Sequence, residues 1–147
     1  MGLVRFAFPL MLALSILGCV RHPSAVAPGS VAPVALADTS WILVSGPVSM
    51  APGDRVVFRF TGDGRVGISG LCNQIGGRYL HRDGHVEFQD MISTMVACTD
   101  DRKMRLESEV GRSMSGALPV EAGSGQDRVA ALRIGVAPGQ SWIFERE

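Results

Sequence analysis

The chain has 147 residues, which suits one domain with additional segments, and its 14 basic and 14 acidic side chains give a formal charge of zero. A protein that mainly binds nucleic acid usually carries a basic excess, so this balance argues against that class. Apolar residues make up 46% of the chain and charged residues 19%, so the chain can bury a core and is not disordered throughout.

The first 18 residues have the pattern of a secretory signal peptide. Arg5 precedes the apolar run 6–17, which is shorter than the roughly 20 residues of a membrane-spanning helix. The run ends in Ile-Leu-Gly-Cys at 16–19, which resembles a bacterial lipobox, although its second residue is bulkier than usual. We expect residues 1–18 to be the signal peptide and Cys19 to carry the lipid. An uncleaved signal anchor and an ordinary signal that ends near a cysteine are the alternatives.

The residues after the cysteine indicate where the lipoprotein resides. An aspartate directly after the lipidated cysteine favours the inner membrane in such proteins, and Val20 takes that place here. The resemblance therefore implies an outer-membrane anchor facing the periplasm. Residues 19–37 are rich in proline, alanine and serine, and we expect them to form a flexible tether. The folded domain is then expected at 38–147.

The domain begins with alternating apolar residues that are typical of antiparallel strands. Asp63-Gly64 and Asp83-Gly84 each lie between two such runs and suit tight hairpin turns. The expected strands are 41–44, 55–60, 65–69, 78–81, 85–88, 128–134 and 141–146.

Residues 100–115 change to a helical period. Leu106, Val110 and Met114 recur every four residues, and Thr99 or Asp100 is suited to cap the helix start. We therefore predict an α+β fold: a mostly antiparallel, strongly curved β-sheet arranged as a meander, with one packed α-helix.

Two cysteines remain once Cys19 is assigned to the lipid. An exported domain meets an oxidising compartment, where Cys72 and Cys98 are expected to form a disulfide. Two buried thiols are the alternative. The chain has no Cys-x-x-Cys motif, so a thioredoxin-like redox role lacks its signature.

The segments around these cysteines resemble the META domain family, the type found in HslJ-like bacterial envelope lipoproteins. The matching motifs are Trp-x-Leu at 41–43, Gly-Leu-Cys-Asn at 70–73, Gly-x-Tyr at 77–79, Ser-Thr-x-x-Ala-Cys at 93–98, and the helical positions 107, 110 and 114. Leu71 and Val110 depart from the family's usual glycine and larger apolar residue. The resemblance implies an envelope protein associated with heat-shock and envelope stress or drug tolerance, with no agreed ligand.

Several patterns that suggest chemistry lack the context that the chemistry requires. Residues 62–67 spell the Gly-x-Gly-x-x-Gly dinucleotide fingerprint, but a strand pattern follows where a helix is needed. His81, His85 and Glu87 flank the second hairpin turn, and we expect a solvated tip there and no metal site. Asn73 is a possible ligand contact, and a bond to nearby backbone is the competing assignment.

These observations favour a non-enzymatic, lipid-anchored envelope protein that serves stress tolerance and contacts another envelope component. We expect no cofactor and no nucleic-acid partner. The alternative is a binding module with a defined target, such as an inhibitor of a cell-wall hydrolase, and an enzyme ranks third because no catalytic group stands out.

Overall fold

The computed structural model describes residues 34–124 and 130–147, so the expected signal peptide, Cys19 and most of the expected tether lie outside the described residues. The elements are β1 (Thr39–Ser45), β2 (Val56–Phe60), β3 (Arg65–Ser69), β4 (Ile75–Arg82), β5 (His85–Ser93), α1 (Asp101–Ser113), β6 (Ala117–Ser124), β7 (Ala130–Ala137) and β8 (Gln140–Arg146). No helix in this described part is both long and apolar enough to cross a membrane.

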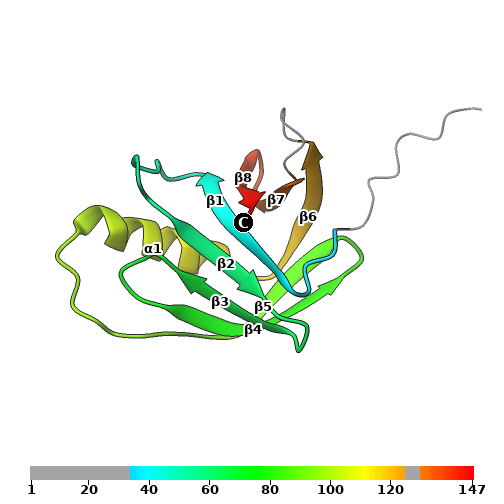
Figure 1. Cartoon of the computed structure of the whole chain (residues 1–147), viewed down its shortest axis with the longest axis horizontal. Coiled ribbons are helices and arrows are strands. Elements are labelled where there is room, and N and C mark those ends of the chain that lie inside the picture. The colour runs from blue at the N-terminus through cyan, green and yellow to red at the C-terminus, as the bar shows by residue number, and fades with distance from the viewer. Residues whose placement is uncertain (1–33, 125–129) are drawn as a thin grey trace, which may run out of the picture. The chain divides into compact units, whose positions relative to one another are not determined.

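The eight strands form one closed antiparallel barrel (Figure 1). Each strand pairs with the next along the chain, and β1 closes the barrel by pairing with β8, where Trp41 lies opposite Arg146. In such an up-and-down barrel the connections alternate between the two ends. The β1–β2, β3–β4, β5–β6 and β7–β8 connections therefore share one end, and α1 lies within the β5–β6 connection at that end.

The predicted α+β class with a curved meander sheet is wrong, because the sheet is a closed, mostly β barrel with one helix of 13 residues. The two expected Asp-Gly hairpins are present as β2–β3 and β4–β5. Closure depends instead on pairing between residues about a hundred positions apart, which no local pattern reveals. β6 was not predicted at all, although Leu118 and Val120 alternate inward along it.

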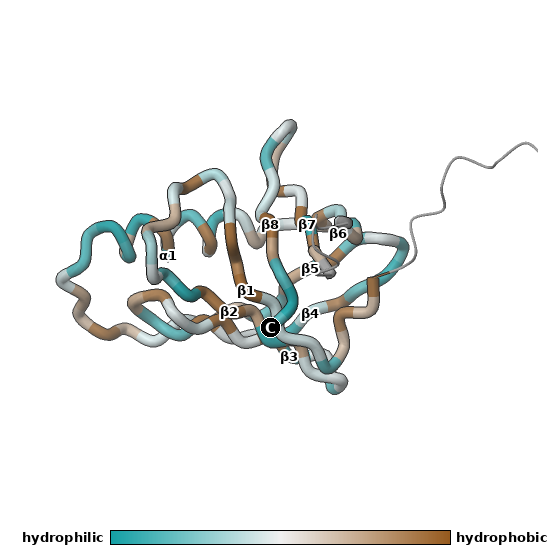
Figure 2. The backbone as a smooth tube through the Cα atoms, turned by 45° about the horizontal axis from the view of Figure 1, so that its top comes forward, coloured by the Kyte–Doolittle hydropathy of each residue, from teal (hydrophilic) through white to brown (hydrophobic). Residues whose placement is uncertain are grey.

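Alternation along the strands fills the barrel with side chains. The inward positions of β2, β3 and β8 include Phe58, Ile68 and Phe144. The rings of Phe58 and Phe144 pack edge to face, with their centroids 4.9 Å apart. Figure 2 shows the matching mixture of hydrophobic and hydrophilic positions along the tube. A cavity between α1 and the barrel wall, lined in part by Met114 and Trp142, measures only about 10 Å³. That volume accommodates a water molecule at most.

Residues before β1 close the other end of the barrel. Leu36, which lies in the segment expected to be a tether, is buried in the core at 1% exposure. The Thr39 hydroxyl donates to the Leu36 carbonyl oxygen at 2.5 Å and accepts a bond from the Trp41 indole at 2.7 Å. The Gly62 amide of the β2–β3 turn donates to the Asp38 carboxylate at 2.7 Å, so this segment is held on two sides.

Candidate functional site

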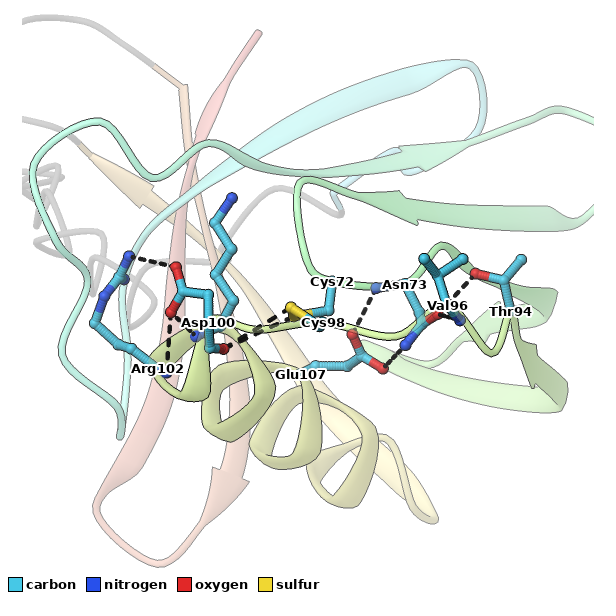
Figure 3. The surroundings of a disulfide bond; sticks show 9 residues. Cys72, Asn73, Thr94, Val96, Cys98, Asp100, Arg102 and Glu107 are labelled. Carbon is cyan, nitrogen blue, oxygen red and sulfur yellow. Dashed lines mark hydrogen bonds and ion pairs between the residues drawn. A yellow bond between two sulfur atoms is a disulfide. The ribbon is translucent and has the colours of Figure 1, made fainter.

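The disulfide between Cys72 and Cys98 is present and joins the β3–β4 connection to the segment that precedes α1 (Figure 3). Their Cα atoms lie 5.8 Å apart. The bond closes a loop with a sequence separation of 26, and in the chain-entropy model such a cross-link stabilises the native state by restricting the unfolded chain. It fixes the start of α1 relative to the barrel.

Asn73 adds a second attachment beside the disulfide, and both ends of its side-chain amide are engaged (Figure 3). Its backbone amide and Nδ2 donate to the two carboxylate oxygens of Glu107 in α1, at 2.7 and 2.9 Å. Its Oδ1 accepts from the Val96 amide at 2.7 Å and from the Thr94 hydroxyl at 3.1 Å. Asn73 thus holds both the helix and the β5–α1 connection. Its partners lie 21 to 34 positions away in the chain, so these are not the bonds to nearby backbone of the competing assignment.

A charged pair provides the third attachment of α1. Both terminal nitrogens of Arg102 donate to the carboxylate of Asp54 in the β1–β2 connection, one of them at 3.1 Å. Asp54 also accepts from the Ala51 amide at 2.8 Å, and its side chain is only 6% exposed. The hydrogen bond from Arg102 lowers the pKa of Asp54, because it stabilises the ionised carboxylate. The pairing links residues 48 positions apart, so no spacing in the sequence pointed to it.

The helix start itself follows the sequence prediction. Asp100 is the N-cap, and its carboxylate accepts from the backbone amides of Arg102 and Lys103, each at 3.0 Å. The bond from the Lys103 amide is the main reason that the pKa of Asp100 is lowered. Thr99, the other candidate cap, lies one residue before it and is exposed.

These attachments hold three apolar side chains out in solvent. Ile92, Met95 and Val96 are 75%, 99% and 64% exposed, and we name them the apolar rim. Ile92 lies in β5, and Met95 and Val96 lie on the connection between β5 and α1, where Figure 2 shows hydrophobic positions. Besides the bonds that Thr94 and Val96 donate to Asn73, the Thr94 amide donates to the Gln74 carbonyl oxygen at 3.0 Å. Adjacent exposed apolar residues on a held segment are typical of a contact surface.

The other residues singled out in the sequence do not come together as a site. His81 has a buried Nε2 without a partner in the described part of the chain, and burial lowers its pKa. His85 instead contacts the Asp83 carbonyl oxygen at 2.9 Å. Within the described ranges no three His, Cys, Asp or Glu residues are grouped as metal ligands. Residues 62–67 form the β2–β3 turn and the start of β3, so no helix follows them.

Comparison with known proteins identifies the fold. A profile of the META domain matches residues 34–147. A protein from Burkholderia xenovorans, solved by NMR, is 22% identical with a TM-score of 0.65, and the match covers 86% of this chain and 97% of that one. A second NMR structure is 15% identical with a TM-score of 0.58, covering 75% and 90%. At these identities the solved structures show the fold alone. No curated protein matches the chain.

The disulfide is expected to contribute strongly to stability. Cys72→Ser should lower the free energy of unfolding by about 2–5 kcal/mol, the usual range for a native disulfide in a small exported domain. Cys98→Ser should lose a similar amount, and the double variant should be scarcely worse, because one bond cannot be lost twice. Urea unfolding of the four proteins measures this. The predicted role of the disulfide would be contradicted if the losses of the two single variants added up in the double variant. It would also be contradicted if reductant left the melting temperature of the wild type unchanged.

The ion pair between Asp54 and Arg102 should make stability depend on pH. The pKa of Asp54 is lower in the native state than in the unfolded chain, where a value of about 3.9 is usual. The pair therefore stabilises fully above that value and is lost as the pH falls through the native pKa. Asp54→Asn should cost about 1–2 kcal/mol at neutral pH, allowing for the exposure of Arg102.

Urea unfolding across the acid range provides the measurement. The difference between wild type and Asp54→Asn should shrink as the pH drops below about 4. Glu145→Gln, on the exposed face of β8, is the matched control and should show little difference at any pH. A constant difference for Asp54→Asn would show that packing, and not charge, accounts for the loss.

Proposed function

Since the chain belongs to the META domain family over residues 34–147, we propose that it is an HslJ-like, lipid-anchored envelope protein. In this proposal it acts in envelope or heat-shock stress tolerance by binding a partner, without catalysing a reaction. Cys19 carries the lipid, and the domain faces the periplasm from the outer membrane. The sequence Ile-Leu-Gly-Cys at 16–19, followed by Val20, supports the anchor and its membrane.

The exposed apolar rim is the observation that carries the binding function. Met95 is 99% exposed, yet hydrogen bonds to Asn73 hold the residue on either side of it, through the Thr94 hydroxyl and the Val96 backbone amide. Apolar side chains gain free energy when they leave water, at roughly 25 cal/mol per Å² of buried surface. A segment that is held in place also loses little conformational entropy on binding. The rim therefore has the properties of a preorganised contact surface.

The packed interior supports a function on the outside of the barrel. Phe58, Phe144 and Trp142 fill the space that a carrier barrel would keep for its ligand. With about 10 Å³ left between α1 and the barrel wall, that part of the core has no room for a small molecule.

Inhibition of a cell-wall hydrolase is the second candidate, and the shape of the β5–α1 connection favours it. Residues 92–97 are exposed without interruption, and the disulfide at Cys98 holds the base of this stretch. A held, projecting apolar segment is suited to enter the cleft of an enzyme. Slowed hydrolysis of purified peptidoglycan by one envelope hydrolase, restored by Met95→Asp, would support this candidate over a stress-tolerance role without an enzyme target.

Lipid attachment is tested by metabolic labelling with a fatty-acid probe. The wild-type chain should incorporate the probe and lose residues 1–18, because the lipobox-like sequence directs modification of Cys19. Cys19→Ala should remain unlabelled and unprocessed, whereas Cys72→Ser is the matched cysteine control and should still be labelled. An unlabelled wild-type chain would contradict the anchor.

The binding function is tested by placing a photocrosslinking residue, p-benzoylphenylalanine, at position 95 in living cells. Irradiation should give one discrete adduct, and the same residue in place of Arg133, exposed on β7, should not give that adduct. Cells in which Met95→Asp replaces the wild-type chain should then be as sensitive to heat as a deletion strain, at unchanged protein level. Full tolerance in the Met95→Asp strain would contradict the proposed role of the rim.

A further inference from the structure

The outer wall of the barrel carries a hollow across strands β2 to β5. Its floor is the cross-strand pair of Gly67 on β3 and Gly76 on β4. In the same row across the sheet, Arg59 on β2 lies opposite Gly67, and Ile92 on β5 lies opposite Gly76. The next outward row along β3 and β4 is the pair Arg65 and Arg78. All of these residues, with Asp90, line the hollow, which we name the arginine hollow.

The fold does not require glycine at either floor position. A Cβ atom added at Gly67 would meet nothing within 4 Å, and at Gly76 only the Val66 carbonyl oxygen at 3.7 Å, an ordinary contact. Neither residue has a positive φ. By contrast, a Cβ at Gly77 would lie 2.3 Å from the Met91 sulfur and one at Gly70 only 1.8 Å from the Arg55 carbonyl oxygen. Because glycine weakens a strand interior, two glycines that packing does not need indicate that the hollow itself is used.

The charge around the hollow is positive. Three guanidinium groups line it against the single carboxylate of Asp90. Arg59 lies 3.8 Å from Glu147 and Arg65 lies 3.7 Å from Asp63, so both are partly compensated at long distance. Arg78 makes no ion pair with any residue in the described part of the chain. The planar fork of an arginine matches a carboxylate, which makes a carboxylate-bearing ligand the complementary one.

The apolar rim adjoins this charge, because Ile92 belongs to both surfaces. We propose that the arginine hollow and the rim together bind an acidic, apolar segment of a partner protein. Carboxylates of the segment pair with Arg78 and Arg59, and its apolar side chains pack on Ile92 and Met95. The proposal rests on the binding function above and names the chemistry of the partner. A glycan offers no apolar side chains to the rim, and a flat membrane surface does not enter a hollow.

The probe is a capped peptide that alternates glutamate and leucine, titrated into the isotope-labelled domain and followed by NMR. The amide signals of Gly67 and Gly76 should shift and saturate, and the affinity should fall as salt is added. A matched peptide with lysine in place of glutamate should leave both signals unchanged. The absence of any shift at millimolar glutamate peptide, or equal shifts with the lysine peptide, would overturn the proposal.

Matched variants separate the hollow from general effects. Gly67→Val should fill the hollow and weaken binding of the peptide by at least about tenfold. The melting temperature should stay the same or rise, because valine favours a strand. Gly111→Val, at an open position on α1, is the control and should bind normally. Arg78→Gln should also weaken binding about tenfold, whereas Arg133→Gln on β7 should not. Wild-type affinity in Gly67→Val would overturn the proposal.

Rival occupants give different outcomes of the same titration. If polygalacturonate or vesicles of phosphatidylglycerol shift Gly67 and Gly76 while the glutamate peptide does not, the occupant is an acidic glycan or a membrane surface and the proposal is wrong. The photocrosslink at position 95 is independent of these results. An adduct there without peptide binding would contradict the arginine hollow as a binding site but support a partner at the rim. Peptide binding without an adduct would contradict the cellular role of the rim.

Discussion

The attachment of α1 to the β3–β4 connection is the constraint on which the rest of the domain depends. A helix of 13 residues is marginal on its own, and Gly111 in its third turn weakens it further. The disulfide from Cys72 and the bonds from Asn73 to Glu107 fix its first two turns to the barrel. With the helix start fixed, Leu106, Val110 and Met114 complete the core at that end. Near its C-terminus, Ser113 accepts from the indole of Trp142 at 2.8 Å, so both ends of the helix are held.

This arrangement also explains why the candidate binding surface lies where it does. α1 closes one end of the barrel and the segment around Leu36 closes the other, while aromatic and aliphatic side chains fill the space between them. The proposed partner contact is therefore assigned to the outer wall and the connections. The same Asn73 that bonds to Glu107 holds the backbone at Val96. The side chain that secures the helix thus also holds the segment of the apolar rim, and stability and the proposed recognition depend on the same residue.

Apart from the disulfide between Cys72 and Cys98, the features predicted from the sequence were local ones, and the other long-range contacts were not predicted. The Asp-Gly turns predicted the β2–β3 and β4–β5 hairpins, and the four-residue spacing with Thr99 or Asp100 as cap predicted α1, because these signals act between near neighbours. Pairing of β1 with β8 makes the difference between a curved sheet and a closed barrel, and it joins residues with no local relation. The bonds from Arg102 to Asp54 and from Asn73 to Glu107 are equally non-local. Asn73 itself was noticed only through its place beside Cys72.

Glycine shows why the surface could not be inferred before the fold was known. Residues 62–67 match the letters of a phosphate-binding fingerprint, yet each of their glycines is present for a different physical reason. Gly64 has a φ of 78° in the hairpin turn, which a glycine adopts without strain. Gly62 leaves room for the carboxylate of Asp38, which would lie 2.8 Å from an added Cβ. Gly67 has neither reason, and it becomes informative only when β4 brings Gly76 beside it and Arg78 next to both. A glycine that neither backbone nor packing requires points to the space above it. On this barrel that space lies beside the exposed side chain of Ile92 and beside Arg78, which makes no ion pair within the described residues.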